Sequence, residues 1–228
     1  MANFIKFTIL FCGKPLGPEH REFYDRIFDA EIGDEVKDII RLSALRESAL
    51  DPSILFQSKN GSDGEQKKIT QFVNSIFEGN PEVENRIYDE LVRIVKEKFS
   101  RGEKTVIYSD LITGVTDKVR DLLEKEGIPT LVDNRRDIGL KQKLFQIEPQ
   151  IGVIIGSPKS IGEGASYTSA NNALFLMAPY EHYKIVQGIG RLLRPGQQHE
   201  DVNIFYLFGR DTIMEGILQY LLIQNSYF

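Results

Sequence analysis

The sequence predicts an α/β fold, a doubly wound parallel sheet with helices on both faces, preceded by a mainly helical extension. From residue 80 onward, short runs that are apolar throughout alternate with longer segments of helical spacing. Strands that are apolar on both sides are typical of a parallel sheet whose two faces are covered. The alternation indicates βαβ units, whose crossover helices provide that cover. Ligands of such sheets bind at the loops beyond the carboxyl ends of the strands.

Four apolar runs in this part of the chain predict strands, at residues 105–109, 151–157, 173–177 and 203–208. Segments of helical spacing accompany them, at residues 81–99, 115–127, 136–146 and 181–193. The first of these segments opens with Pro81 and acidic residues, which is a common start of a helix. Helices therefore separate most of the predicted strands.

We interpret residues 1–79 as a lead-in strand with a helical extension, and residues 80–228 as the α/β lobe. The first part begins with an apolar run at residues 4–11 and continues into segments of helical spacing at 19–29 and 34–48. Residues 58–66 are rich in glycine, serine and charge, and this composition predicts a loop.

Composition excludes several classes of protein. The 28 Lys and Arg residues against 33 Asp and Glu residues give a net charge of -5, so any phosphate-binding surface must be a local patch. Cys12 is the only cysteine, which excludes an internal disulfide and a multi-cysteine zinc site. His182 and His199 lack partners at metal-ligand spacing, so we expect no metal site. No apolar run approaches the roughly 20 residues that span a bilayer, and we expect an intracellular protein, cytoplasmic or nuclear.

The segment QGIGRLLRPGQ, residues 187–197, carries the strongest chemical signal. Gln187, Arg191 and Arg194 stand at i, i+4 and i+7, so a helix would place all three on one face. Pro195 and the following glycine predict that the helix stops there, with Arg194 projecting from its end. A guanidinium so placed can pair with phosphate oxygens. Taken alone, the spacing is more often found in a surface helix with solvated arginines.

A second segment, SPKSIGEGASYTSANNALFLM at residues 157–177, follows a predicted strand. Its serines, Lys159 and the glycines Gly162 and Gly164 predict a loop whose N–H groups could hold a phosphate. Glycines at a strand end fit a tight turn without a ligand equally well.

Together the two segments resemble motifs V and VI of superfamily 2 helicases, and specifically of SWI/SNF-type DNA translocases. Twelve residues match those motifs with the matching gaps, namely Ser157, Gly162, Gly164, Thr168, Ala170, Asn171, Gln187, Gly190, Arg191, Arg194, Gly196 and Gln197. The segment GEKTVIYSD is similar to motif IV, with Ser109 in the place of its serine. The chain departs from the family at Ala165 and Ser166, where leucine and asparagine are usual.

This resemblance implies the second RecA-like lobe, the C-terminal lobe, of an ATP-dependent motor that moves on nucleic acid, with duplex DNA the favoured track. By the same resemblance, Arg191, Arg194 and Gln187 would be catalytic. Gly162, Gly164 and Ser166 would contact the nucleotide. Four residues would contact the nucleic-acid backbone, namely Ser109, Ser157, Lys159 and Ser160.

ATP and magnesium would be held mainly by a first lobe. A motor needs a GxxxxGK[ST] loop for the phosphates and a DExx-type motif for magnesium. Neither is in this sequence, so we expect the N-terminal RecA-like lobe to belong to a longer protein or to a partner chain, and the isolated chain to be inactive.

Two other readings stay open. The chain could be a non-catalytic interaction module of the same fold, although such a surface has no need of the arginine segment. It could also be a nucleotide- or sugar-nucleotide-binding α/β enzyme that uses Gly162 and Gly164, which would leave the arginines unexplained.

Overall fold

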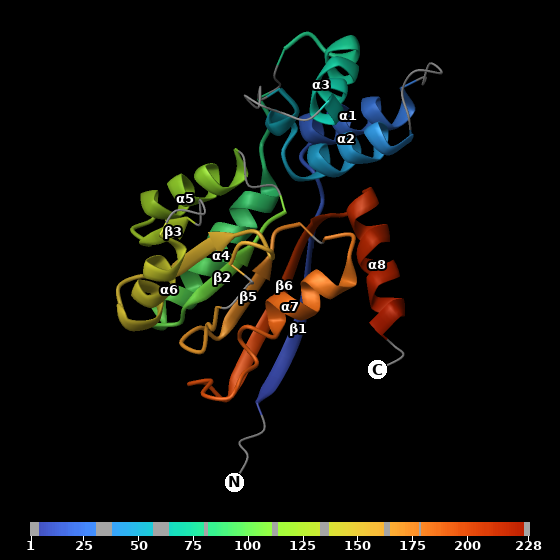
Figure 1. Ribbon diagram of the computed structural model, residues 1–228. Helices are drawn as coiled ribbons and strands as arrows, with labels where there is room; N and C mark the ends of the chain where they lie inside the picture. The colour runs from blue at the N-terminus through green and yellow to red at the C-terminus, as the bar shows by residue number, and fades with distance from the viewer. Residues whose placement is uncertain are drawn as a thin grey trace. The chain divides into compact units, whose positions relative to one another are not determined.

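A computed structural model describes residues 5–30, 38–56, 64–79, 82–110, 114–132, 137–161, 165–177 and 179–225 (Figure 1). The chain divides into two compact units. The sheet unit comprises the described residues within 1–12, 88–207 and 220–228. The helical unit comprises those within 13–87 and 208–219. In the described part of the chain, no helix is long and apolar enough to cross a membrane.

Within the described ranges the sheet has six strands, in the order β1-β6-β5-β2-β4-β3, and is parallel throughout. Its strands are β1 (Lys6–Lys14), β2 (Thr105–Tyr108), β3 (Thr130–Val132), β4 (Val153–Gly156), β5 (Asn172–Phe175) and β6 (Asp201–Gly209). The residues of β2, β4 and β5 are all buried, as their continuous apolar character requires. The predicted α/β fold with a parallel sheet is therefore confirmed. The apolar runs did not predict β3, which has only three residues.

Four helices lie wholly or mainly in the sheet unit, namely α4 (Arg86–Ser100), α5 (Val115–Lys125), α6 (Ile138–Ile147) and α7 (His182–Ile189). A further helix, α8, spans Ile213–Asn225. The first of them, α4, begins at Arg86, later than the predicted start near residue 81. The cause is Asn85, whose side-chain oxygen accepts a hydrogen bond from the N–H of Ile87 at 3.2 Å and so caps the helix.

A ladder of aromatic rings crosses four strands of the sheet unit. Tyr108, Phe175 and Tyr206 stand in register on β2, β5 and β6 and stack at centroid distances of 4.9 and 5.1 Å. Phe11 of β1 stacks on Tyr206 at 5.6 Å. The Tyr108 hydroxyl donates a hydrogen bond to the carbonyl of Gly188 at 2.8 Å, which fixes α7 against this face of the sheet.

The helical unit contains α1 (Pro18–Asp29), α2 (Asp38–Leu50), the 3-10 helix η1 (Pro52–Phe56) and α3 (Gly64–Ile76). Pro18 occupies the first turn of α1, where its missing N–H costs no hydrogen bond. The unit has its own apolar core, in which Ile27, Ala44 and Leu55 are fully buried. Phe23 of α1 stacks on Phe77, which follows α3, at 3.9 Å. This core accounts for the helical extension that the sequence predicts.

Candidate functional site

The carboxyl ends of β2 and β4 meet at one edge of the sheet. Tyr108 and Gly156 are paired residues at the ends of these neighbouring parallel strands. The N–H of Ser109 donates to the carbonyl of Gly156 at 3.0 Å. Ser109 and Ser157, the first residues beyond the two strands, are thereby placed side by side. The predicted motif IV and motif V segments therefore begin at the same edge, where ligands of such sheets bind.

The turn after β4 is built by two serines. Ser157 and Ser160 hydrogen-bond reciprocally: the N–H of each donates to the hydroxyl oxygen of the other, at 3.0 and 2.9 Å, and the two hydroxyls lie 2.9 Å apart. Ile161 closes the turn, with a fully buried side chain. This local pattern presents Lys159 at the surface, with an exposed side chain.

The four residues predicted to contact nucleic acid thus differ in access. Lys159 is exposed and Ser160 is partly exposed, whereas Ser157 is largely buried and Ser109 has no exposed surface. The hydroxyls of Ser157 and Ser160 are engaged in the turn itself. Of the three residues predicted to contact nucleotide, Gly162 and Gly164 lie outside the described residues. Ser166 is partly buried, and its carbonyl accepts a hydrogen bond from Gln146.

Gln146 of α6 holds the loop between β4 and β5 at two points. Its amide nitrogen donates to the carbonyl of Ser166, and its amide oxygen accepts the N–H of Ser169 at 2.9 Å. The neighbouring Phe145 packs edge-on against Tyr167 of the same loop, with ring centroids 5.8 Å apart. Sequence reasoning missed this role. The sequence alone does not show whether a glutamine on a helix faces solvent or contacts a loop 20 residues away.

The helix of the second motif ends earlier than predicted. The sequence led us to expect a helix to Arg194 that stops at Pro195, but α7 ends at Ile189. Gly190 forms its C-cap, and Arg191 and Leu192 donate their N–H groups to carbonyls only three residues back, as in a tightening last turn. The glycines at 188 and 190 lower the helix propensity before Pro195 is reached. The residues that follow α7 instead form turns held by contacts to the loop after β4.

Both arginines nevertheless meet at one atom. The Nη1 of Arg191 and the Nη1 of Arg194 each donate to the carbonyl oxygen of Ala165, at 3.3 and 3.1 Å. The Nε of Arg194 also donates to the carbonyl of Gly190 at 3.0 Å. The predicted juxtaposition of Arg191 and Arg194 therefore exists, but turns after α7 create it rather than one helix face. Gln187 is exposed on α7, and its side chain forms no hydrogen bond with the described residues.

The two motif segments are joined along their length. Tyr167 donates its N–H to the carbonyl of Arg191 at 2.9 Å, and Gln198 donates to that of Thr168 at 3.0 Å. The side chain of Gln197 donates to the carbonyls of Ala170 and Leu192, at 3.0 and 2.9 Å. The motif residue Gln197 thus fastens one motif to the other. These bonds fix the turns after α7, which contain Arg191 and Arg194, relative to the loop after β4.

Arg191 and Arg194 place positive charge beside the loop after β4. In the part of the chain that the structure describes, neither Arg191 nor Arg194 forms an ion pair with a carboxylate. Burial raises the pKa of the Tyr108 phenol well above its usual value, as does Tyr167, while the positive charge of Arg191 opposes the rise. The guanidinium of Arg191 therefore interacts electrostatically with Tyr108 at the buried end of β2, as well as donating a hydrogen bond to the loop.

Lys184 of α7 is a further cation at this edge that the motifs did not predict. Its Nζ pairs with Glu181 at 2.9 Å and with Asp110, just beyond β2, at 4.0 Å. Burial alone would lower the pKa of Lys184, but the hydrogen bond to Glu181 and the charge of Asp110 raise it overall. The i, i+3 spacing of Glu181 and Lys184 could have been read from the sequence, but the link to Asp110 could not.

No group of three or more His, Cys, Asp or Glu side chains is placed to hold a metal among the described residues.

Comparison with known proteins identifies the fold. Neither a protein-family model nor a curated protein sequence matches the chain. Among solved structures, it is similar to the C-terminal part of the Fun30 ATPase domain, with a TM-score of 0.74 and 19% identity over 95% of this chain and 89% of that one. It is also similar to the Sulfolobus solfataricus SWI2/SNF2 ATPase C-terminal domain, with a TM-score of 0.56 and 20% identity over 97% of this chain and 86% of that one. The predicted resemblance to SWI/SNF-type C-terminal lobes is thus confirmed at the level of the fold, which is RecA-like.

Proposed function

We propose, from the fold shared with these C-terminal ATPase domains, that the chain is the second motor lobe of an ATP-dependent DNA translocase. The observation that carries the proposal is the convergence of Arg191 and Arg194 on the carbonyl of Ala165. Two guanidinium nitrogens within hydrogen-bond distance of one atom repel each other, and no described carboxylate neutralises them. An anion brought to this place would relieve that repulsion.

The anion we propose is the phosphoryl group of ATP during its transfer. A guanidinium offers a planar set of donors that matches phosphate oxygens, and in phosphoryl transfer it stabilises the developing charge. In this scheme a first lobe binds ATP and magnesium, and Arg191 and Arg194 contribute from this lobe across the shared cleft. Gln187, exposed on α7, is the third residue that we assign to the catalytic face.

Contacts to DNA are assigned to the turn after β4. Lys159 is the exposed cation of that turn, and we assign it the direct contact with a backbone phosphate. Ser157 and Ser160 hold the turn that presents Lys159, and Ser109 binds the end of β2 to the end of β4. Contacts of this kind position the protein on DNA without reading its sequence. Movement of this edge when the cleft closes would couple ATP hydrolysis to translocation.

The test is ATP hydrolysis by an assembly of this chain with a first ATPase lobe that carries the Walker A loop, with and without duplex DNA. We expect the assembly to hydrolyse ATP and this turnover to rise when duplex DNA is added. The first lobe alone should show little ATP turnover and little response to DNA. If the chain leaves the turnover of the first lobe unchanged, the proposal fails, and the fold serves as a non-catalytic interaction module instead.

A further inference from the structure

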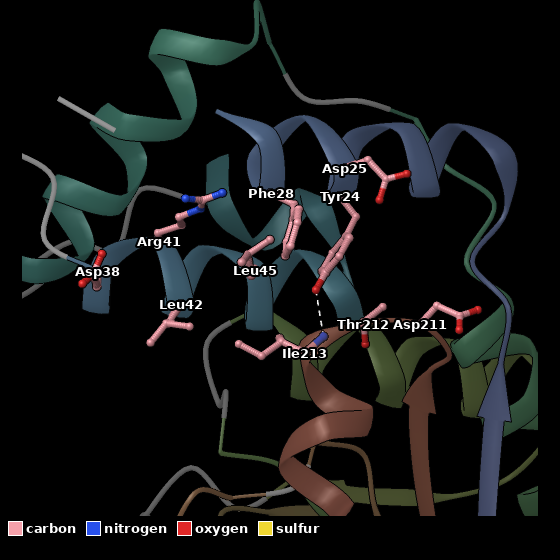
Figure 2. Close-up of a pocket in the computed structure, with 10 residues that line it drawn as sticks. All are labelled: Tyr24, Asp25, Phe28, Asp38, Arg41, Leu42, Leu45, Asp211, Thr212 and Ile213. Atoms are coloured by element: carbon pink, nitrogen blue, oxygen red, sulfur yellow. Dashed lines mark hydrogen bonds between the residues drawn. The ribbon is translucent and has the colours of Figure 1, made fainter. Parts of the chain in front are cut away.

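The helical unit contains a groove that no motif residue lines. It is formed by α1, α2 and the turn that leads into α8 (Figure 2). Its volume is about 740 Å³. All of its lining residues belong to the helical unit. The groove is therefore a feature of one compact body.

The floor of the groove is apolar and partly open to water. Leu45 and Tyr24 are buried beneath it, whereas Phe28 is 55% exposed and Leu42 is 42% exposed. Apolar side chains of this size, exposed together in a concave surface, are characteristic of an interaction site. Phe28 and Leu42 come from different helices, so the exposed apolar surface extends across the groove and is not a single isolated side chain.

The walls of the groove are held in place by hydrogen bonds. The Tyr24 hydroxyl accepts the N–H of Ile213 at 2.8 Å, which joins α1 to the start of α8 (Figure 2). Arg21 donates to the carbonyls of Arg210 and Asp211 at 2.6 and 3.0 Å. Because all three bonds cross from one wall to the other, the groove is already formed without an occupant.

The rim of the groove is acidic at both ends. Asp38 lies at one end, and Asp25 and Asp211 lie at the other (Figure 2). Asp25 pairs with Arg21 at 3.4 Å, but Asp38 and Asp211 form no ion pair within the described chain. Among the described residues that line the groove, Arg41 is the single cation, and it stands over the ring of Phe28 at 5.6 Å. The carboxylates therefore outnumber the guanidiniums, and an occupant with positive charges at its ends fits best.

We infer that this groove binds a peptide segment of a partner protein in which apolar side chains are flanked by lysine or arginine. The apolar residues would cover Phe28 and Leu42, and the flanking cations would face Asp38 at one end and Asp211 at the other. The acidic rim repels the phosphates of nucleic acid. The net charge of -5 on the chain opposes a second copy as the occupant. This inference does not depend on the proposed motor activity.

The experiment is a selection from a displayed library of random peptides, followed by fluorescence anisotropy with the synthetic peptides that it enriches. We expect the enriched peptides to carry leucine or aromatic residues flanked by lysine or arginine. Glutamate in place of their basic residues should weaken binding at least about tenfold, since like charges would then meet at the rim. Binding should also weaken as salt is raised, because the rim is exposed to solvent.

Matched variants locate the binding site. Leu42→Glu should weaken binding at least about tenfold, as loss of a central apolar contact does, while Ile39→Glu should leave it unchanged. Ile39 is 58% exposed on the same helix but does not line the groove, so the two variants place the same charge inside and outside it. The double change Asp38→Asn and Asp211→Asn should weaken binding and flatten its salt dependence. The control is Glu78→Gln, at an exposed position of the same unit that does not line the groove. Circular dichroism verifies that each variant is folded.

Several outcomes would overturn the inference. The library could enrich no peptide, or it could enrich acidic peptides. Binding could survive Leu42→Glu in a folded protein, or Leu42→Glu and Ile39→Glu could weaken binding equally. If light scattering shows a dimer that Leu42→Glu dissociates, the occupant is a second copy and the peptide assignment is wrong. None of these measurements involves ATP or DNA, so their failure is distinguishable from failure of the motor proposal.

Discussion

Lys159 is the exposed cation of the turn after β4, and the reciprocal hydrogen bonds of Ser157 and Ser160 present it. If it contacts a backbone phosphate, Lys159→Glu should weaken binding of duplex DNA to the same extent for every sequence and reduce the salt dependence of binding. Anisotropy titrations with two unrelated duplexes at several salt concentrations measure both effects.

The control is Lys125→Glu, which makes the same charge change at the end of α5. A helix that follows a parallel strand ends at the opposite edge of the sheet, so this variant should bind DNA nearly as the wild type does. Equal losses in the two variants would mean that DNA responds to net charge and not to the turn.

Gln146 is the side chain that fixes the loop carrying the acceptor of both arginines. Its oxygen accepts the N–H of Ser169 at 2.9 Å, so Gln146→Ala should expose that amide to exchange with solvent. We expect hydrogen exchange at Ser169 to accelerate at least about tenfold, whereas Gln150→Ala, at an exposed position beyond α6, leaves it unchanged. Unaltered exchange in Gln146→Ala would show that other contacts hold the loop.

The motif residues show how far the sequence predicts a site. Spacing identified Arg191, Arg194 and Gln197 because a recurrent pattern of residue types marks them, and the structure brings all three to the loop after β4. Spacing could not show that the hydroxyls of Ser157 and Ser160 bond to each other, or that Gln146 reaches the loop. Those contacts depend on side-chain directions that only the folded chain defines.

At the scale of elements, α7 depends on the absence of a side chain at residue 188. A Cβ on Gly188 would lie 3.2 Å from both Phe175 and Tyr108, which belong to the buried aromatic ladder and cannot easily yield. Gly188→Ala should therefore lower the free energy of unfolding by about 1–2 kcal/mol, as overpacking does, despite the better helix propensity of alanine.

Gly216 provides the comparison for this prediction. It lies within α8, and nothing stands within 4 Å of a Cβ built there. Gly216→Ala should raise stability by about 0.4–1 kcal/mol, because it only restricts the unfolded chain. Urea denaturation followed by circular dichroism measures both variants, and a stabilised Gly188→Ala would contradict the close packing of α7 on the sheet.

The ends of elements were less predictable than their existence. Continuous apolar runs identified β2, β4, β5 and β6, because burial on both faces leaves that signature in the sequence. The end of α7 was predicted at Pro195 but lies at Ile189. The glycines at 188 and 190 and Pro195 all disfavour helix, and the turns that follow α7 decide at which of them the helix ends. Those turns are held by Gln197, which bonds to Leu192, and by Tyr167, which is remote in sequence and bonds to Arg191.

At the scale of the whole molecule, the chain supplies one side of the proposed ATP site. It has no GxxxxGK[ST] loop and no DExx-type motif, so we expect the purified chain to show no ATP turnover above background, with or without duplex DNA. A coupled assay for phosphate release measures this. Turnover near 1 per second, which is ordinary for an enzyme, would mean that the chain holds ATP and magnesium by itself.

The central claim is that Arg191 and Arg194 act on the transferring phosphoryl group, and ATP turnover by the two-lobed assembly tests it most directly. Arg191→Ala and Arg194→Ala should each lower turnover by about 1000-fold, as loss of an arginine finger does, with the melting temperature little changed. Arg194→Lys should rescue poorly, since an ammonium cannot reproduce the parallel hydrogen bonds of a guanidinium. If all three variants keep full turnover, or lose it only in proportion to their loss of folded protein, the arginines brace the loop after β4 and the account is wrong.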